Sequence, residues 1–185
     1  MTHADTKTKL YTRYPASHIA LYNGVTVLHF LLGGAGIMLG YGPSWLAYLF
    51  SALYLAFAFV EMYLVMPLKV CPNCVYYGMK DAICISGLNV VSAKIARKGD
   101  VKNFSSRARG LLCHNNMYIA SLVLPIIAII PALIINFSLV MPAIFIALSG
   151  LLIIRFFVFF TKMVCPHCRA KNICPNAQSM GLSSQ

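Results

Sequence analysis

Four long apolar segments alternate with polar ones along the chain, and this pattern predicts the fold. The apolar segments cover residues 18–41, 44–67, 115–137 and 140–163. Each is long enough to cross the hydrocarbon core of a bilayer, which takes about 20 helical residues. Because backbone polar groups in lipid must be satisfied internally, and continuous apolar runs are not barrel strands, we expect four transmembrane α-helices.

Short joints connect these helices in pairs. Residues 40–44 read Gly-Tyr-Gly-Pro-Ser and residues 136–138 read Asn-Phe-Ser, so each joint allows only a tight antiparallel turn. We therefore expect an all-α membrane protein, a four-helix bundle of two helical hairpins. Hairpin 1 covers residues 18–77, hairpin 2 covers residues 114–169, and the polar ends are residues 1–17 and 170–185. Residues 1–17 lack the apolar core of a removable signal peptide, so the first helix is expected to direct insertion.

A basic amphipathic stretch lies between the hairpins, within the polar connector of residues 78–113. Leu88, Val91 and Ile95 share one helical face, and basic residues at positions 94 to 98 lie towards the other side. This pattern is typical of a helix lying in the membrane interface. The helix serves either as a strap packed on the bundle or as a docking face for a partner protein.

The composition agrees with a membrane protein, because 59% of the residues are hydrophobic and only 10% are charged. All fifteen Lys and Arg residues except Arg155 lie in the N-terminal segment, between residues 69 and 109, or from residue 162 onward. By the positive-inside rule both termini and the connector are cytoplasmic. We expect a multi-pass protein of a bacterial or archaeal inner membrane. Anionic lipid headgroups then balance the net charge of +11, and no nucleic-acid partner is expected, since no recognition fold is visible.

A cysteine motif occurs at the cytoplasmic end of each hairpin. Residues 70–74 read Val-Cys-Pro-Asn-Cys and residues 164–168 read Val-Cys-Pro-His-Cys. A third cysteine follows each motif, at Cys84 and at Cys174. The recurrence indicates an internal duplication of the chain.

Aligning the two motifs brings further residues into register. Glu61 and Arg155 each lie ten residues before the first cysteine of their motif. Upstream, each hairpin opens with His-x-x-x-Tyr, beginning at His18 and at His114. Since each half contains an even number of spans, we expect parallel repeats related by a pseudo-twofold axis along the membrane normal.

The cysteines favour a metal site over disulfides, because the expected topology places all seven at the reducing face of the membrane. The sequence allows two groupings of the metal ligands. One gives each half its own site: His18, Cys71, Cys74 and Cys84 in the first half, and His114, Cys165, Cys168 and Cys174 in the second. The other joins Cys71, Cys74, Cys165 and Cys168 in a single site between the halves. The spare candidates are Cys113 and His167.

Zinc is the favoured ion, because thiolates prefer it and a Cys-x-x-Cys turn lets two sulfurs bind it with near-tetrahedral geometry. Iron, bound singly or as an Fe–S cluster, is the alternative and would make the protein an electron carrier. Haem b is a third possibility, with His18 and His114 as axial ligands, and His29 lies on the same helical face as His18.

The sequence Cys-Pro-His-Cys resembles the redox dithiol of thioredoxin-fold oxidases, and four-helix membrane thiol oxidoreductases are similar in size and number of spans. These resemblances imply thiol–disulfide exchange. In thioredoxin-fold oxidases the first cysteine starts a helix, whereas here the motif follows one, and the expected topology puts the thiols on the opposite side from those of the membrane enzymes.

Glu61 and Arg155 are the formal charges well inside the spans, where a charge costs about 2.5–3.5 kcal/mol. We expect an ion pair between the second and fourth spans, and a proton or quinone site is the alternative. Gly33, Gly36 and Gly40 in the first span give a face of small residues, which packs within the bundle or against another subunit.

Together these features favour a non-catalytic accessory subunit or assembly factor of a larger membrane complex, with a structural Cys/His metal site. The sequence contains no Ser-His-Asp set, phosphate-binding loop or second intramembrane carboxylate, so hydrolase and phosphoryl-transfer activities have no support. The alternatives are a membrane redox protein that passes electrons from an iron, Fe–S or haem centre to quinone, and a thiol–disulfide oxidoreductase.

Overall fold

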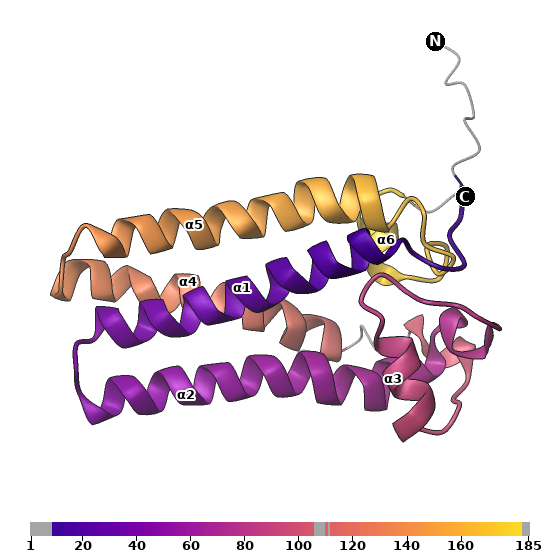
Figure 1. Ribbon diagram of the computed structural model, residues 1–185, viewed down its shortest axis with the longest axis horizontal. Helices are drawn as coiled ribbons and strands as arrows, with labels where there is room; N and C mark the ends of the chain where they lie inside the picture. The colour runs from indigo at the N-terminus through magenta and orange to yellow at the C-terminus, as the bar shows by residue number, and fades with distance from the viewer. Residues whose placement is uncertain (1–8, 106–109, 111, 183–185) are drawn as a thin grey trace, which may run out of the picture.

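The computed structural model describes residues 9–105, 110 and 112–182, and the regular elements in these residues are helical. Four long helices run side by side (Figure 1): α1 (Ala16–Gly40), α2 (Trp45–Val60), α4 (His114–Ile135) and α5 (Val140–Ile154). A ten-residue π-helix continues two of them, η1 (Glu61–Val70) after α2 and η6 (Arg155–Val164) after α5.

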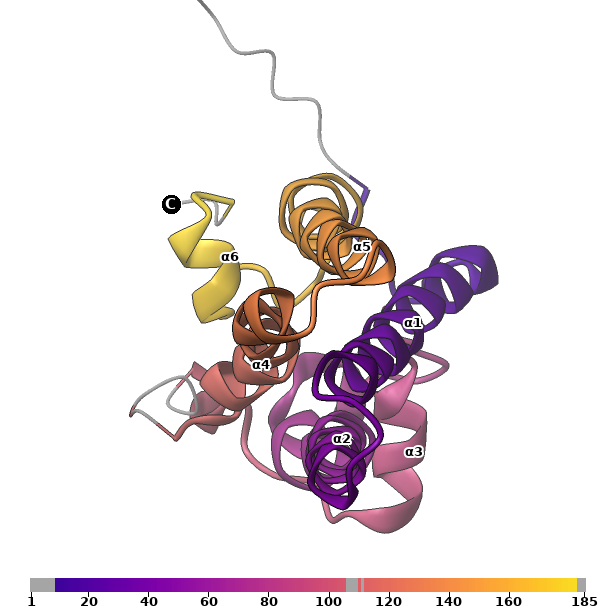
Figure 2. The ribbon, with the colours of Figure 1, turned by 90° about the vertical axis from the view of Figure 1, so that its left-hand side faces the viewer.

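Four helices in the described residues are long and apolar enough to cross a membrane, as predicted. They cover Ala16–Gly40, Trp45–Asn73, His114–Ile135 and Val140–Val164. The second is longer than expected from the sequence, because its helical path continues through Pro67 into the first cysteine motif. Viewed along the bundle, α1 packs against α2, α4 and α5 (Figure 2).

The turn between α1 and α2 is set by its glycine and serine. Gly42 has a φ of +74°, a conformation that side chains disfavour. Ser44 then caps α2, because its Oγ accepts the backbone N–H of Ala47 at 3.2 Å. The exposed aromatic residues Trp45 and Tyr48 begin α2 at this end, which is typical of a membrane–water interface.

The glycine face of α1 lies inside the bundle. An added Cβ at Gly33 would lie 2.8 Å from Cβ of Pro125, and one at Gly40 would lie 2.6 Å from Cβ of Ala132, both in α4. These glycines therefore allow close packing of α1 on α4 within one chain. Of the two roles expected for this face, packing within the bundle is the one seen around Gly33, Gly36 and Gly40.

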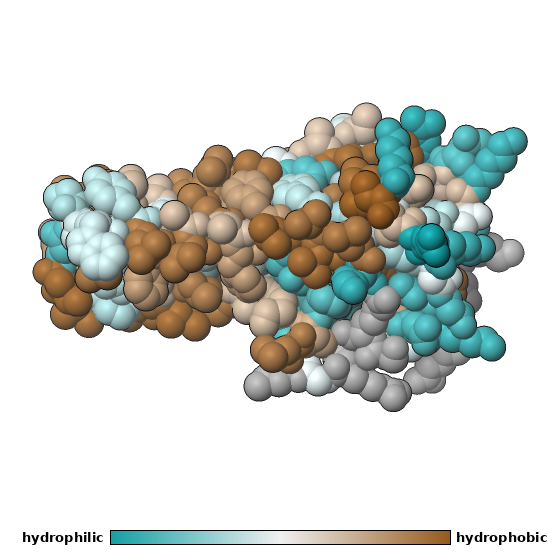
Figure 3. All heavy atoms as spheres, turned by 90° about the horizontal axis from the view of Figure 1, so that it is seen from below, coloured by the Kyte–Doolittle hydropathy of each residue, from teal (hydrophilic) through white to brown (hydrophobic). Residues whose placement is uncertain are grey.

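The outer surface of the bundle is apolar, and the hydrophilic side chains gather at the end where α1 begins and η6 ends (Figure 3). We call this end the cap. Its helical segments are η2 (Cys71–Asn73), η3 (Val75–Gly78), α3 (Leu88–Ile95), η4 (Val101–Asn103) and α6 (Pro175–Ser179).

The predicted amphipathic helix forms as α3, but only part of its predicted apolar face is buried. Leu88, Asn89 and Ser92 are buried, and α3 packs against η1, η2 and η3. Val91 and Ile95 are 43% and 49% exposed. The polar side chain of Asn89 takes an inward position because its amide donates to the carbonyl of Ala82 at 2.8 Å, which satisfies it in the interior.

Candidate functional site

The first cysteine motif folds into a tight turn directly after η1. The backbone N–H of Cys74 donates to the carbonyl of Cys71 at 3.0 Å, and that of Tyr77 donates to the carbonyl of Cys74 at 3.0 Å. The side chain of Asn73 is 5% exposed, and its Oδ1 accepts the backbone N–H of Asp100 at 3.2 Å. Asn73, the residue that differs between the two motifs, therefore holds the connector of residues 78–113 in place.

The second motif makes the same hydrogen bonds after η6. The N–H of Cys168 donates to the carbonyl of Cys165 at 3.2 Å, and that of Lys171 donates to the carbonyl of Cys168 at 3.2 Å. His167 donates its Nδ1–H to the carbonyl of Lys9 at 2.9 Å, so this spare ligand candidate binds the N-terminal segment instead.

The N-terminal segment lies between the second motif and the chain that follows the first. The N–H of Tyr11 donates to the carbonyl of His167 at 2.9 Å, and the carbonyl of Thr12 accepts the N–H of Ile83 at 3.1 Å. These bonds form two isolated parallel bridges, one to each side. The segment thereby fastens the two halves of the cap together.

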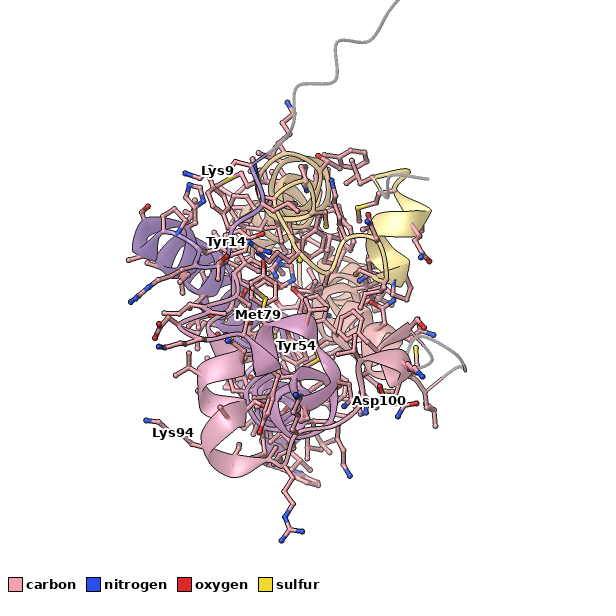
Figure 4. The ribbon with its side chains drawn as sticks, turned by 90° about the vertical axis from the view of Figure 1, so that its right-hand side faces the viewer. Lys9, Tyr14, Tyr54, Met79, Lys94 and Asp100 are labelled. Carbon is pink, nitrogen blue, oxygen red and sulfur yellow. The ribbon has the colours of Figure 1, made fainter. Side chains whose placement is uncertain are left out.

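Three buried residues, Tyr14, Tyr76 and Ala82, form the core of the cap, and we call them the cap core. The hydroxyl of Tyr76 donates to the carbonyl of Tyr11 at 2.8 Å and accepts the N–H of Arg169 at 3.2 Å. In Figure 4, which looks onto the cap, Tyr14 and Met79 lie towards the middle and Lys94 lies at the edge.

Thiols from both halves pack against the cap core, namely those of Cys74, Cys84 and Cys168. Burial raises the pKa of Cys74 to about 12, and the neighbouring thiols of Cys84, Cys168 and Cys174 add to this rise. Burial likewise raises the pKa of Cys168 to about 11. These two thiols are therefore protonated at neutral pH, whereas the cysteines of thiol oxidoreductases have lowered pKa values.

Neither predicted ligand set is assembled as a metal site. Within residues 9–105, 110 and 112–182, no three His, Cys, Asp or Glu side chains are grouped closely enough to hold an ion. Cys71 packs against the core of the transmembrane bundle. The sulfur of Cys113 accepts the N–H of Asn116 at 3.4 Å and caps α4.

The predicted pair of Glu61 with Arg155 is replaced by two separate arrangements. Oε1 of Glu61 lies 3.2 Å from Nδ1 of His114, within hydrogen-bond distance, and this contact is an ion pair only when the imidazole is protonated. The two residues meet because η1 packs against the start of α4. His114 also lines a cavity of about 130 Å³ together with Met66, Phe104 and Cys174.

Arg155 is fully buried and contacts neutral partners. Its guanidinium donates to the hydroxyl of Tyr118 and, at 2.6 Å, to Oγ1 of Thr26. The ring of Tyr22 lies 5.2 Å from the guanidinium carbon, and the hydroxyls of Tyr22 and Tyr118 are 3.1 Å apart. Hydroxyl groups and aromatic faces thus solvate this cation inside the bundle.

The new pairing predicts which intramembrane substitutions interact energetically. We expect a double-mutant cycle between Glu61→Gln and His114→Gln to give a coupling of about 1–3 kcal/mol, since the two side chains are in contact. The cycle between Glu61→Gln and Arg155→Gln should be additive within about 0.5 kcal/mol. Denaturation in detergent, followed by helical circular dichroism, measures both. A larger coupling of Glu61 to Arg155 than to His114 would restore the original pairing.

Two of the three candidate haem histidines are engaged with protein groups. His29 donates its Nε2–H to the carbonyl of Leu122 at 2.9 Å, and His114 contacts Glu61. Nδ1 of His18 is buried and has no hydrogen-bond partner among the described residues.

Several residues of the site had no clear signal in the sequence. Tyr76 and Asn73 act through contacts with segments far away in the chain, which no local pattern indicates. Tyr22 and Tyr118 stand in the repeated His-x-x-x-Tyr pattern, and that pattern marked their position without showing that they contact each other.

We compared the chain with protein-family models, curated proteins and solved structures, and none of the three comparisons gave a match.

Proposed function

We propose that this protein is a non-catalytic subunit or assembly factor of a larger membrane complex, and that a structural metal ion fastens the cytoplasmic ends of its two hairpins. The observation that carries the proposal is the convergence of cysteines from both halves on the cap core of Tyr14, Tyr76 and Ala82. A metal bound there would join the ends of the spans, as structural zinc sites join chain segments elsewhere.

Duplicated hairpins related by a pseudo-twofold axis are part of the proposal. In support, η1 and η6 have equal lengths, each leads into a cysteine motif, and the two motifs share their turn hydrogen bonds. The tyrosines of the two His-x-x-x-Tyr patterns contact each other, with 3.1 Å between the hydroxyls of Tyr22 and Tyr118. Equivalent residues meet in this way when they lie on the symmetry axis.

A cytoplasmic cap in a bacterial or archaeal inner membrane fits the positions of the basic residues. Apart from Arg155, the described Lys and Arg residues lie at the end of the bundle opposite the two hairpin turns. The outward side chains of α3 fit the lipid interface, where Val91 and Ile95 contact acyl chains and Lys94 binds an anionic headgroup.

Partner subunits would contact the outer faces of the bundle, because the glycine face of α1 is covered within the chain. Large exposed aliphatic and aromatic residues are available on α2, on α5 and on η6, among them Phe50 of α2 and Phe157 of η6. Thiol–disulfide exchange is disfavoured, since buried, protonated thiols are poor nucleophiles.

A second candidate function is proton-coupled electron transfer to quinone. One observation favours it: the imidazole of His114, held by Glu61, lines a cavity with the apolar side chains of Met66, Val70 and Phe104. A histidine positioned by a carboxylate is a common proton donor and acceptor, and apolar walls suit a quinone ring.

Purification from native membranes in mild detergent tests the proposed function. We expect tagged protein to retain specific membrane subunits at a fixed stoichiometry, and Cys74→Ser to lose them because the cap no longer holds its shape. Cys113→Ser is the matched control and should retain them, since serine also caps a helix. A lone protein that reduces quinone, with activity lost in His114→Gln, would instead support the second candidate.

A further inference from the structure

A groove of about 430 Å³ lies on the outer side of the fourth span, where α5 continues into η6 and the chain after α6 comes alongside. Its volume falls within the usual range for sites that hold a small molecule, about 300–1,000 Å³. The side chains that line it are apolar except for one threonine: Leu152, Ile153, Phe156, Phe157, Thr161 and Met180.

The helical wall of the groove is fixed by packing within the chain. Leu152 packs against the core of the transmembrane bundle. The ring of Phe156 packs edge to face on the ring of Phe160, with 5.5 Å between the centroids. Ile153 and Phe157 are 57% and 68% exposed, so the groove is open towards the surroundings of the bundle.

The C-terminal segment bounds the groove at the cap. In the view along the bundle, α6 lies outside the four long helices, beside α4 and α5 (Figure 2). The side chain of Asn176 donates to Oδ1 of Asn115 in α4 at 2.7 Å, and Ala177 is buried, so α6 is fastened to the bundle. The N–H of Met180 in turn donates to the carbonyl of Asn176. A partner helix that followed the groove beyond the bilayer would meet α6, whereas a chain that ends within the bilayer would not.

The lining suits a hydrocarbon chain better than a polar ligand. Among the described residues that line the groove, Thr161 alone has a polar side chain, and its hydroxyl donates to the carbonyl of Phe157 in the same helix. A polar ligand would give up its hydrogen bonds to water here without replacing them. An acyl chain has none to lose, and it gains contact with aromatic and aliphatic side chains.

A basic residue stands at the cap end of the groove. In a π-helix the N–H of residue i+5 bonds to the carbonyl of residue i, so Lys162 lies about one turn beyond Phe157 in η6. The side chain of Lys162 is exposed, and its apolar stem lets the ammonium group reach the polar surface of the bilayer. An anionic lipid headgroup is the opposite charge found at that depth.

We infer that the groove binds one acyl chain of an anionic phospholipid from the leaflet on the cap side of the bilayer, and that Lys162 binds the headgroup. The inference goes beyond the proposed function, because it requires neither a metal ion nor a partner subunit. A lipid held there would lie between this face and any subunit that contacts Phe157.

Photocrosslinking of the unmodified full-length protein tests the site. The protein would be placed in phosphatidylcholine vesicles with a small share of phosphatidylglycerol that carries a photoreactive group on one acyl chain. We expect adducts to concentrate on residues 152–161 and on Met180, above the level at Ile146, an exposed residue two turns before Ile153 and outside the groove. Peptide mass spectrometry locates them. Adducts spread evenly along α5 and η6 would show that bulk lipid alone covers this face, and would overturn the inference.

Two variants test the chain and the headgroup separately. Ile153→Trp fills the groove and should lower its adducts to the level at residue 146, whereas Ile146→Trp is the matched control and should leave them unchanged. Lys162→Gln should reduce the preference for labelled phosphatidylglycerol over labelled phosphatidylcholine about fivefold, the usual contribution of one lysine near an anionic surface. Lys80→Gln, at an exposed cap residue outside the groove, should keep the preference. An unchanged preference in Lys162→Gln would overturn the headgroup assignment.

A benzoylphenylalanine in place of Phe156 tests the other possible occupant in native membranes. We expect the photoproduct to have the mass of one chain plus one phospholipid. A crosslink to another protein would show that the groove is a subunit interface, and would overturn the lipid inference while leaving the proposed metal site untouched.

Discussion

Replacing Gly36 with leucine is expected to lower the free energy of unfolding of the bundle by about 3 kcal/mol, the upper part of the usual range for overpacking. A Cβ at this position would lie 2.5 Å from Cδ1 of Ile129 in α4 and 3.1 Å from Cγ2 of Ile144 in α5. Both neighbours are buried and belong to the other hairpin, so relief requires the two hairpins to separate. Thermal denaturation in detergent, followed by helical circular dichroism, measures the loss.

Gly24→Leu is the matched control in the same helix. Apart from the adjacent residues and backbone of its own helix, nothing lies within 4 Å of a Cβ built at Gly24, and the residue is exposed on the bundle surface. Leucine there should be neutral or slightly stabilising, because it favours helix over glycine and faces lipid. Equal losses in the two variants would mean that α1 does not pack on the second hairpin through its glycine face.

If zinc fastens the cap as proposed, removing it should loosen the cap and leave the spans intact. If free zinc is about 1,000 times its dissociation constant, its removal costs about 4 kcal/mol of stability. The effect should be local, since the cysteines follow the spans and pack on the cap core. Hydrogen exchange after chelation should rise at the amides that close the two motif turns, including Tyr77 and Lys171.

The control for this experiment is Cys84→Ser, a variant of one of the predicted ligands, whose cap should already exchange fast and should not respond to the chelator. Amides in the middle of α1 and α4 report the bundle and should keep their protection in every sample. Unchanged exchange in the cap of the unmodified protein would show that no metal holds it.

The helices were largely predictable, because the signals that define them are local. The lengths of the apolar segments predicted the four spans, and the residues around Gly42 and Ser44 predicted the first turn. The length of the second span was underestimated. Pro67 normally disfavours a continuing helix, yet the chain continues past it as a π-helix. The inward position of Asn89 depends on a carbonyl from another segment, which periodicity does not show.

The partners of the site residues were predicted less well, because they depend on which segments meet. Matched depth suggested that Glu61 and Arg155 pair, but depth does not determine the side of a helix. The start of α4 brings His114 to Glu61, and one turn later Tyr118 meets Arg155. Similarly, the spacing of Cys71 and Cys74 suggested that both bind one ion, whereas the fold turns Cys71 towards the transmembrane core and Cys74 towards the cap core.

We propose that a zinc ion joins the two halves of the cap, and elemental analysis of the unmodified protein is the decisive test. The protein would be purified from native membranes without chelators, and its metals would be quantified by mass spectrometry together with an absorption spectrum. We expect one zinc ion per chain and no visible absorption. Metal-free protein, or iron with a coloured spectrum in place of zinc, would contradict it.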